Sequence, residues 1–258
     1  MHRYLFESAL LNKPIMTTNS ILMRHLSYYL YILIFCTAFW GCDNEAQKKA
    51  QRKTDSLARR DSINQVNEAK GKKTILFLGN SLTFGYGLDD PQENSFPGLI
   101  QKRIDSLLLP YKVVNAGLSG ETTTGGRERI NWLLKQKVDI MVLELGGNDG
   151  LRGQSVKVME DNLQEIIDIA RRRYKKIKIL LAGMEAPPNM GLEYTAAFRK
   201  VFKTLAEKNE AVTLIPFILD KIGGNPELNQ NDGIHPTAEG HQIMANTVWK
   251  YLKKFLEK

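Results

Sequence analysis

The feature of this sequence that most constrains its fold is an alternation of short apolar runs with longer amphipathic segments across residues 74–258. Ile75–Leu78 and Ile140–Leu143 are apolar at every position, which is typical of parallel strands buried on both faces. Three further runs carry one or two polar interruptions each and are also predicted strands: Tyr111–Ala116, Ile177–Ala182 and Ala211–Phe217.

The segments that follow these runs have the apolar spacing of amphipathic helices. They are Ser95–Leu108, Gly126–Leu134, Ser155–Tyr174, Leu192–Lys208 and Thr237–Leu256, with Ser155 and Thr237 as expected N-caps. The alternation predicts an α/β three-layer sandwich around a parallel sheet. Ligands of such sheets bind beyond the carboxyl ends of the strands. We therefore expect the turns at Gly79, Gly117 and Gly146 to meet at that edge.

The N-terminal region has the pattern of an export signal. Tyr28–Trp40 is mostly apolar and uncharged, Arg24 precedes it, and Gly41-Cys42 follows. This run is too short to span a bilayer, which takes about 20 residues. A Cys at this place resembles a bacterial lipoprotein signal, in which Cys42 would be lipidated and anchor the protein in a Gram-negative envelope. An ordinary signal and an uncleaved anchor are the alternatives.

The cysteine count agrees with this interpretation. The chain has two Cys, Cys36 within the apolar run and Cys42 after it. Removal of the signal would leave one Cys, which excludes an intramolecular disulfide and a multi-cysteine metal site.

Most of the positive charge lies outside the predicted domain. Residues 1–42 contribute +2 and residues 43–73 contribute +4 to the net charge of +8, so residues 74–258 carry only +2. Residues 43–73 are polar and cannot bury a core, which predicts an extended or weakly helical tether. The chain thus divides into a signal (1–42), a tether (43–73) and one domain (74–258). The basic charge is no evidence for nucleic-acid binding.

Two motifs at opposite ends of the domain carry side chains suited to nucleophilic catalysis. Ser81, in Gly-Asn-Ser-Leu, follows the first strand and could attack a carbonyl group. His235 stands three residues after Asp232, whose carboxylate could orient the ring as a general base. A phosphate-binding loop or a plain N-cap is the alternative at Ser81, and a capped helix start is the alternative at Asp232.

Two glycine-containing segments between these ends could supply oxyanion donors. Gly117–Thr122 and Gly146–Asp149 each follow a predicted strand, and simple turns are the alternative for both. His241 has no carboxylate placed to orient it, so we expect it on the surface or in the core. The sequence lacks metal, Walker and Rossmann motifs, and Thr83 breaks the Gly-x-Ser-x-Gly pattern. We therefore expect neither a metal nor an organic cofactor.

Together, the four motifs resemble the SGNH (GDSL) hydrolase family, in its branch of arylesterases, acyl-CoA thioesterase I and lysophospholipases. The resemblance covers Thr74–Leu256 and rests on four segments: Phe77–Thr83, Val114–Thr122, Leu143–Gly153 and Asp232–Pro236. It implies a flavodoxin-like α/β/α sandwich with five parallel strands in the order 2-1-3-4-5.

The resemblance also implies roles for single residues. Ser81 would be the nucleophile, His235 the base and Asp232 its orienting acid. The oxyanion hole would consist of the Ser81 and Gly120 N–H groups and the Asn148 side chain. Asn80 departs from the usual Asp of the family. We expect this change to keep the geometry, to remove a negative charge near the site and to alter the pH profile.

The resulting hypothesis is a serine esterase that hydrolyses aryl, short-chain acyl or lysophospholipid esters, or thioesters, through an acyl-enzyme. A carbohydrate O-deacetylase is the alternative within enzymes, and a non-catalytic binding protein on the same fold is the alternative outside them. The sequence does not decide the natural substrate or the oligomeric state.

Overall fold

The computed structural model describes residues 45, 47–60, 62 and 71–256. The chain divides into two units, residues 1–61 and 62–258. In the first unit, residues 47–60 form a helix whose side chains are all exposed, as a segment with no core of its own would be. Cys42 and the predicted signal lie outside the described residues. Within the described part of the chain, no helix is both long and apolar enough to cross a membrane.

The second unit is built on one parallel sheet of five strands. In chain order they are β1 (Lys73–Gly79), β2 (Tyr111–Gly117), β3 (Ile140–Glu144), β4 (Lys178–Ala182) and β5 (Val212–Ile215). Their order in the sheet is β2-β1-β3-β4-β5, and every neighbouring pair is parallel. The predicted fold class and strand order are confirmed.

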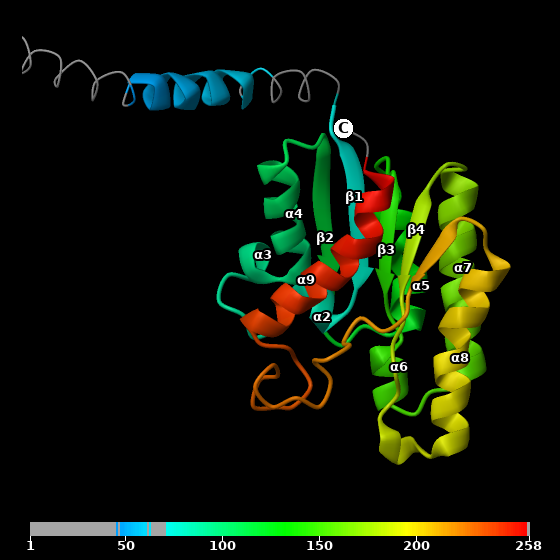
Figure 1. The fold of residues 1–258 in the computed structure, drawn as a ribbon. Coiled ribbons are helices and arrows are strands. Elements are labelled where there is room, and N and C mark those ends of the chain that lie inside the picture. Colours follow the sequence, from blue (N-terminus) through cyan, green and yellow to red (C-terminus); the bar gives the residue numbers. More distant parts are fainter. Residues whose placement is uncertain (1–44, 46, 61, 63–70, 257–258) are drawn as a thin grey trace, which may run out of the picture. The chain divides into compact units, whose positions relative to one another are not determined.

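Five longer helices cover the sheet: α4 (Phe96–Ser106), α5 (Thr123–Leu133), α7 (Val156–Arg173), α8 (Leu192–Lys208) and α9 (Ala238–Leu252). Helices α4 and α9 pack together, and α7 packs against both α5 and α8. Figure 1 shows the sheet between these two groups of helices. Ser155 and Thr237 cap their helices by accepting hydrogen bonds from the N–H groups of Val158 and Gly240, as expected.

Short helices stand outside the predicted helical segments: α2 (Ser81–Phe84), α3 (Pro91–Asn94), α6 (Gly147–Leu151) and the 3₁₀ turn η1 (Pro188–Met190). A second 3₁₀ turn, η2 (Lys253–Phe255), ends the predicted helix Thr237–Leu256. Gly and Asn lower the helix propensity of α6, so the pattern gave no helical signal there. Gly146, with φ of 110°, makes the left-handed turn that starts α6. Figure 1 places α2 and α6 at the end of the sheet where β1 and β3 finish.

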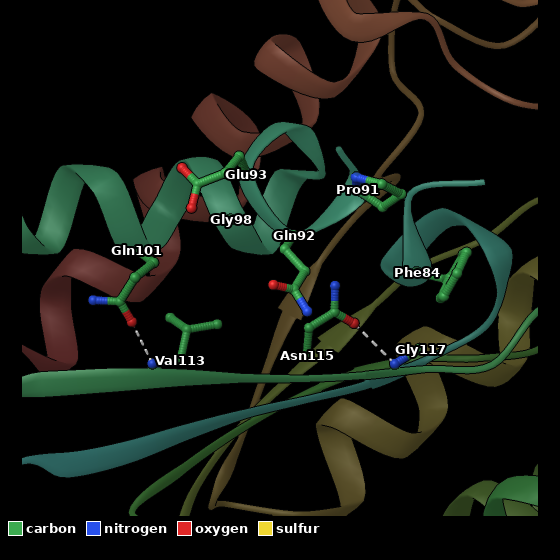
Figure 2. A pocket seen from close by; sticks show the side chains of 9 residues that line it. All are labelled: Phe84, Pro91, Gln92, Glu93, Gly98, Gln101, Val113, Asn115 and Gly117. Carbon is green, nitrogen blue, oxygen red and sulfur yellow. Dashed lines mark hydrogen bonds between the residues drawn. The ribbon is translucent and has the colours of Figure 1, made fainter. Parts of the chain in front are cut away.

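The strands differ in burial, and β2 is the least buried of the five. Only Tyr111 is buried in this strand, whereas β3 is buried throughout. The reason is that β2 lies at the sheet edge and has one neighbouring strand. Two side-chain amides cap its free N–H groups: Gln101 Oε1 accepts from Val113 at 2.6 Å, and Asn115 Oδ1 accepts from Gly117 at 2.9 Å (Figure 2). Capped edges resist pairing with other chains.

A cavity of about 460 Å³ lies along this capped edge, between β2 and the helices α3 and α4 (Figure 2). Its lining combines amide side chains with Glu93 and one aromatic ring, Phe84, and it includes none of Ser81, Asp232 and His235. The Gln101 and Asn115 amides are already engaged with the strand. The cavity is therefore a consequence of the edge geometry.

His241 belongs to the core. Its side chain is buried, Nδ1 accepts from the Phe96 N–H at 3.2 Å, and the ring stacks on Phe96 with centroids 6.3 Å apart. Burial, with a smaller contribution from His235, lowers the pKa of His241 to about 4. The ring is therefore neutral at physiological pH.

The lowered pKa of His241 predicts acid sensitivity of the fold. The stabilising contribution of the neutral ring is complete above the ordinary pKa of 6.5 and is lost as the pH falls towards 4. His241→Asn keeps an acceptor for Phe96 and removes the titration. Between neutral pH and pH 4, the wild type should lose about 2–3 kcal/mol more free energy of unfolding than the variant. Urea unfolding at both pH values measures the difference, and equal losses would contradict the assignment.

Candidate active site

Ser81 is the first residue of α2, directly beyond the carboxyl end of β1. Asn80 caps this helix, because its Oδ1 accepts from the Leu82 N–H at 2.9 Å. The preceding Gly79 leaves no room for a side chain, since a Cβ there would lie 2.0 Å from Thr83 Oγ1. The turn is therefore tight, and it presents the half-buried Ser81 hydroxyl at the sheet edge.

Ser81, His235 and Asp232 form one continuous chain of hydrogen bonds. Ser81 Oγ lies 2.9 Å from His235 Nε2, and His235 Nδ1 lies 2.6 Å from Asp232 Oδ2. The other Asp232 oxygen accepts from the N–H groups of Ile234 at 2.9 Å and His235 at 3.0 Å. The residues that the two motifs predicted are thus brought together across 154 positions of sequence.

The charge on Asp232 determines the tautomer of His235. The hydrogen bond from the His235 ring, followed by those from two backbone N–H groups, lowers the pKa of Asp232 to about 2. An ionised carboxylate can only accept hydrogen bonds, so His235 Nδ1 carries the proton. Nε2 therefore faces Ser81 with a free lone pair and can accept the hydroxyl proton.

Gln230, which the sequence analysis missed, links the loop that carries His235 to the segment after α2, the helix that begins with Ser81. Its Nε2 donates to the Tyr86 carbonyl at 2.8 Å and to the Pro236 carbonyl at 3.0 Å, and its N–H donates to the His235 carbonyl at 2.7 Å. The Tyr86 ring also packs against His235, with centroids 4.6 Å apart. A glutamine in an irregular loop carries no pattern that would have singled it out.

Gly120 and Asn148 meet in a second cluster. Arg152 Nη2 donates to the Gly120 carbonyl, and Asn148 Nδ2 donates to the neighbouring Glu121 carbonyl, both at 3.0 Å. These bonds leave the second amide hydrogen of Asn148 available. Gly120 has φ of 80°, and within the described residues neither its N–H nor that of Ser81 has a hydrogen-bond acceptor.

Buried polar contacts hold this cluster to the strands. Asp149 accepts from the Thr123 N–H at 2.9 Å and from its Oγ1 at 2.6 Å, which ties the first residue of α5 to α6. The Leu118 N–H donates to the Gly79 carbonyl at 3.0 Å, which ties the loop after β2 to the turn that carries Ser81. Burial raises the pKa of Asp149.

Glu144 is the second residue that the sequence analysis missed. It ends β3, is fully buried, and accepts from Asn80 Nδ2 at 2.8 Å, from the Asn80 N–H at 3.2 Å and from Thr83 Oγ1 at 2.7 Å. Burial raises the pKa of Glu144 to about 7, against the lowering effect of these hydrogen bonds. A carboxylate inside an apolar strand run was the available signal, because such residues are rarely buried without a role.

The described residues contain no group of three or more His, Cys, Asp or Glu side chains that could hold a metal ion. The arrangement itself presents a hydroxyl, an imidazole backed by a carboxylate, and N–H donors on adjacent loops.

Several known proteins are similar to this chain. Esterase TesA of Pseudomonas aeruginosa is 39% identical over 192 residues, covering 74% of this chain and 93% of the relative. Thioesterase 1/protease 1/lysophospholipase L1 of Escherichia coli is 34% identical over 186 residues, covering 72% and 86%. A crystal structure of TesA superposes with a TM-score of 0.66 at 38% identity, covering 70% of this chain and 99% of that one.

The model of the GDSL-like lipase/acylhydrolase family matches residues 77–243. This match spans β1 to α9 and includes every residue of the Ser81–His235–Asp232 hydrogen-bond chain. The chain therefore belongs to the GDSL-like lipase/acylhydrolase family.

Proposed function

We propose that this protein is a serine esterase that hydrolyses carboxylic esters and thioesters through an acyl-enzyme. The observation that carries the proposal is the hydrogen-bond chain from Ser81 Oγ through His235 to Asp232. Ser81 acts as nucleophile and His235 as general base. Asp232 orients the His235 ring and stabilises the positive charge that the ring gains when it takes the proton. Relatives named esterase and thioesterase support the same class of reaction.

In the first half of the reaction, Ser81 Oγ bonds to the substrate carbonyl carbon while His235 Nε2 takes the hydroxyl proton. The N–H groups of Ser81 and Gly120 and the Asn148 amide stabilise the oxyanion that forms. The intermediate then collapses, the bond to the leaving alcohol or thiol breaks, and His235 returns the proton to that group.

In the second half, water attacks the acyl carbon and gives a proton to His235. The bond to Ser81 breaks, the carboxylic acid leaves, and Ser81 regains its proton. In each half His235 takes one proton and gives it up again, to the leaving group in the first half and to Ser81 in the second, and no oxidant or reductant is needed.

The surroundings of the site favour acyl and aryl esters over sugar esters. Large apolar side chains are exposed on the segments that carry the candidate site residues: Tyr86, Leu118, Leu151 and Ile234. Tyr86 contacts His235 directly. Apolar groups around the attacking hydroxyl gain free energy by contact with an acyl chain or an aromatic leaving group, at about 25 cal/mol per Å² buried.

We also propose that the protein is exported and anchored in the cell envelope by lipid on Cys42. The support is the apolar run followed by Gly41-Cys42, together with the polar tether after it. A charged, exposed segment such as residues 47–60 suits a spacer between an anchor and an enzyme.

Ser81→Ala should abolish hydrolysis of p-nitrophenyl acetate and leave the fold intact, because it removes only the attacking oxygen. Ser106→Ala is the matched control, since Ser106 is exposed on α4 and its hydroxyl donates to the Arg103 carbonyl, away from the site. Steady-state kinetics and circular dichroism test both variants. Wild-type turnover in Ser81→Ala would remove this residue from the mechanism.

Gln230→Ala should lower kcat about tenfold with little change in KM, because the loop that carries His235 loses two hydrogen bonds, each worth about 0.5–1.5 kcal/mol. Gln242→Ala, on the exposed side of α9, is the control. The same ester assay measures both parameters. An unchanged kcat would show that the loop holds His235 without Gln230.

Mass spectrometry of the natively expressed protein should find an acylated Cys42 at the mature N-terminus. Cys42→Ser should move the protein from the membrane fraction to the soluble fraction, because the acceptor thiol is gone. An unmodified Cys42, or equal partitioning of both proteins, would contradict the anchor.

A further inference from the structure

The carboxyl group of Glu144 lies directly beneath the turn that carries Ser81. Three groups point at it, and all can donate: the Asn80 N–H, the Asn80 side-chain amide and the Thr83 hydroxyl. This environment is complementary to a carboxylate, whose two oxygens only accept. Glu144 therefore collects donors from both sides of Ser81.

No cation balances this carboxylate in the described part of the chain: the contacts above come from uncharged groups. The titratable groups on surrounding elements are engaged elsewhere. Asp149 bonds Thr123, Glu121 pairs with Arg129, and His241 accepts from Phe96. Amide and hydroxyl dipoles alone thus hold the charge of Glu144.

Glu144 determines which way the Asn80 amide points. Asn80 Nδ2 donates to Glu144, so its Oδ1 faces the other way, accepting from the Leu82 N–H at 2.9 Å and lying 3.5 Å from Ser81 Oγ. A flipped amide would place its oxygen against a carboxylate oxygen and its NH₂ against an N–H. Both contacts would be repulsive. The Glu144 carboxylate therefore fixes the orientation of the Asn80 amide, which caps the helix that begins with Ser81.

A carboxyl group at position 80, which is usual in the resembling family, would meet Glu144 at the same place. Two carboxyl oxygens at about this separation cannot both ionise, and one proton is shared between them. The pair would then carry one negative charge, as ionised Glu144 beside the neutral Asn80 does. The charge that the sequence analysis expected to be missing at position 80 is supplied by position 144.

We propose that Glu144 is a positioning residue for Ser81, and that residues 80 and 144 form one hydrogen-bonded pair with a single negative charge, whether position 80 is Asn or Asp. With Asn at position 80, an amide hydrogen bridges the two side chains; with Asp there, a shared proton would bridge them in the same way. This inference rests on the proposed function, because it assigns Ser81 as the residue to be positioned. Burial raises the pKa of Glu144 to about 7, so the pair carries its full negative charge above that pH.

A double-mutant cycle tests the pairing. Glu144→Gln should lower kcat about tenfold or more with KM nearly unchanged, because the new NH₂ group faces the Asn80 and Thr83 donors. Adding Asn80→Asp should recover most of the loss, since the amide introduced at position 144 can then donate to the carboxylate introduced at position 80. Glu207→Gln, exposed on α8, is the matched control. Additive effects, with the double variant no better than Glu144→Gln, would overturn the proposal.

Infrared spectroscopy tests the shared proton independently of turnover. At pH 9, Asn80→Asp should show the carbonyl band of one protonated carboxyl group that is absent from the wild type and from the double variant Asn80→Asp with Glu144→Gln. Absence of this band, or failure of Asn80→Asp to fold, would overturn the proposal even if Glu144→Gln cannot be purified. A wild type that hydrolyses no ester would refute the proposed function, while the spectra would still decide the charge of the pair.

Discussion

The register of β1 with its two neighbours is the constraint on which the site depends. Gly79 pairs with Gly117 of β2 on one side and with Glu144 of β3 on the other. Three strand ends therefore finish level, and the chain leaves each of them at the same edge of the sheet. A slip of one residue in either pair would turn the side chains of that strand to the opposite face and separate Glu144 from the turn it supports.

The remaining half of the site comes from a different kind of structure. His235 and Asp232 lie in an irregular segment beyond β5, which an isolated antiparallel bridge between Asn229 and Pro236 closes. Side-chain hydrogen bonds add to this bridge: Gln230 donates to the Tyr86 carbonyl, and Asp232 accepts from the N–H of His235. The nucleophile thus follows a strand of the main sheet, whereas the base is placed by one short bridge and a few side-chain contacts.

The sequence predicted the strand order through the family resemblance, and the meeting of Ser81 with His235 through motif chemistry. It could do so because buried parallel strands have a strong apolar pattern and because Asp-x-x-His places both partners within one turn. It did not predict α6, since glycine-rich helices have no propensity signal. Nor did it identify Gln230 or Glu144. Their importance comes from contacts with residues far away in the chain. Asn80 was interpreted without its partner Glu144, because Glu144 lies 64 positions away in the sequence.

The short separation between Asp232 and His235 has a mechanical consequence. Because both belong to one loop and bond each other within it, any displacement of that loop carries the carboxylate and the imidazole as a rigid pair. The hydrogen bonds within the pair are kept in such a motion, whereas the position of His235 Nε2 relative to Ser81 Oγ changes. The reactivity of Ser81 in this architecture therefore depends on how closely the loop brings His235 Nε2 to Ser81 Oγ.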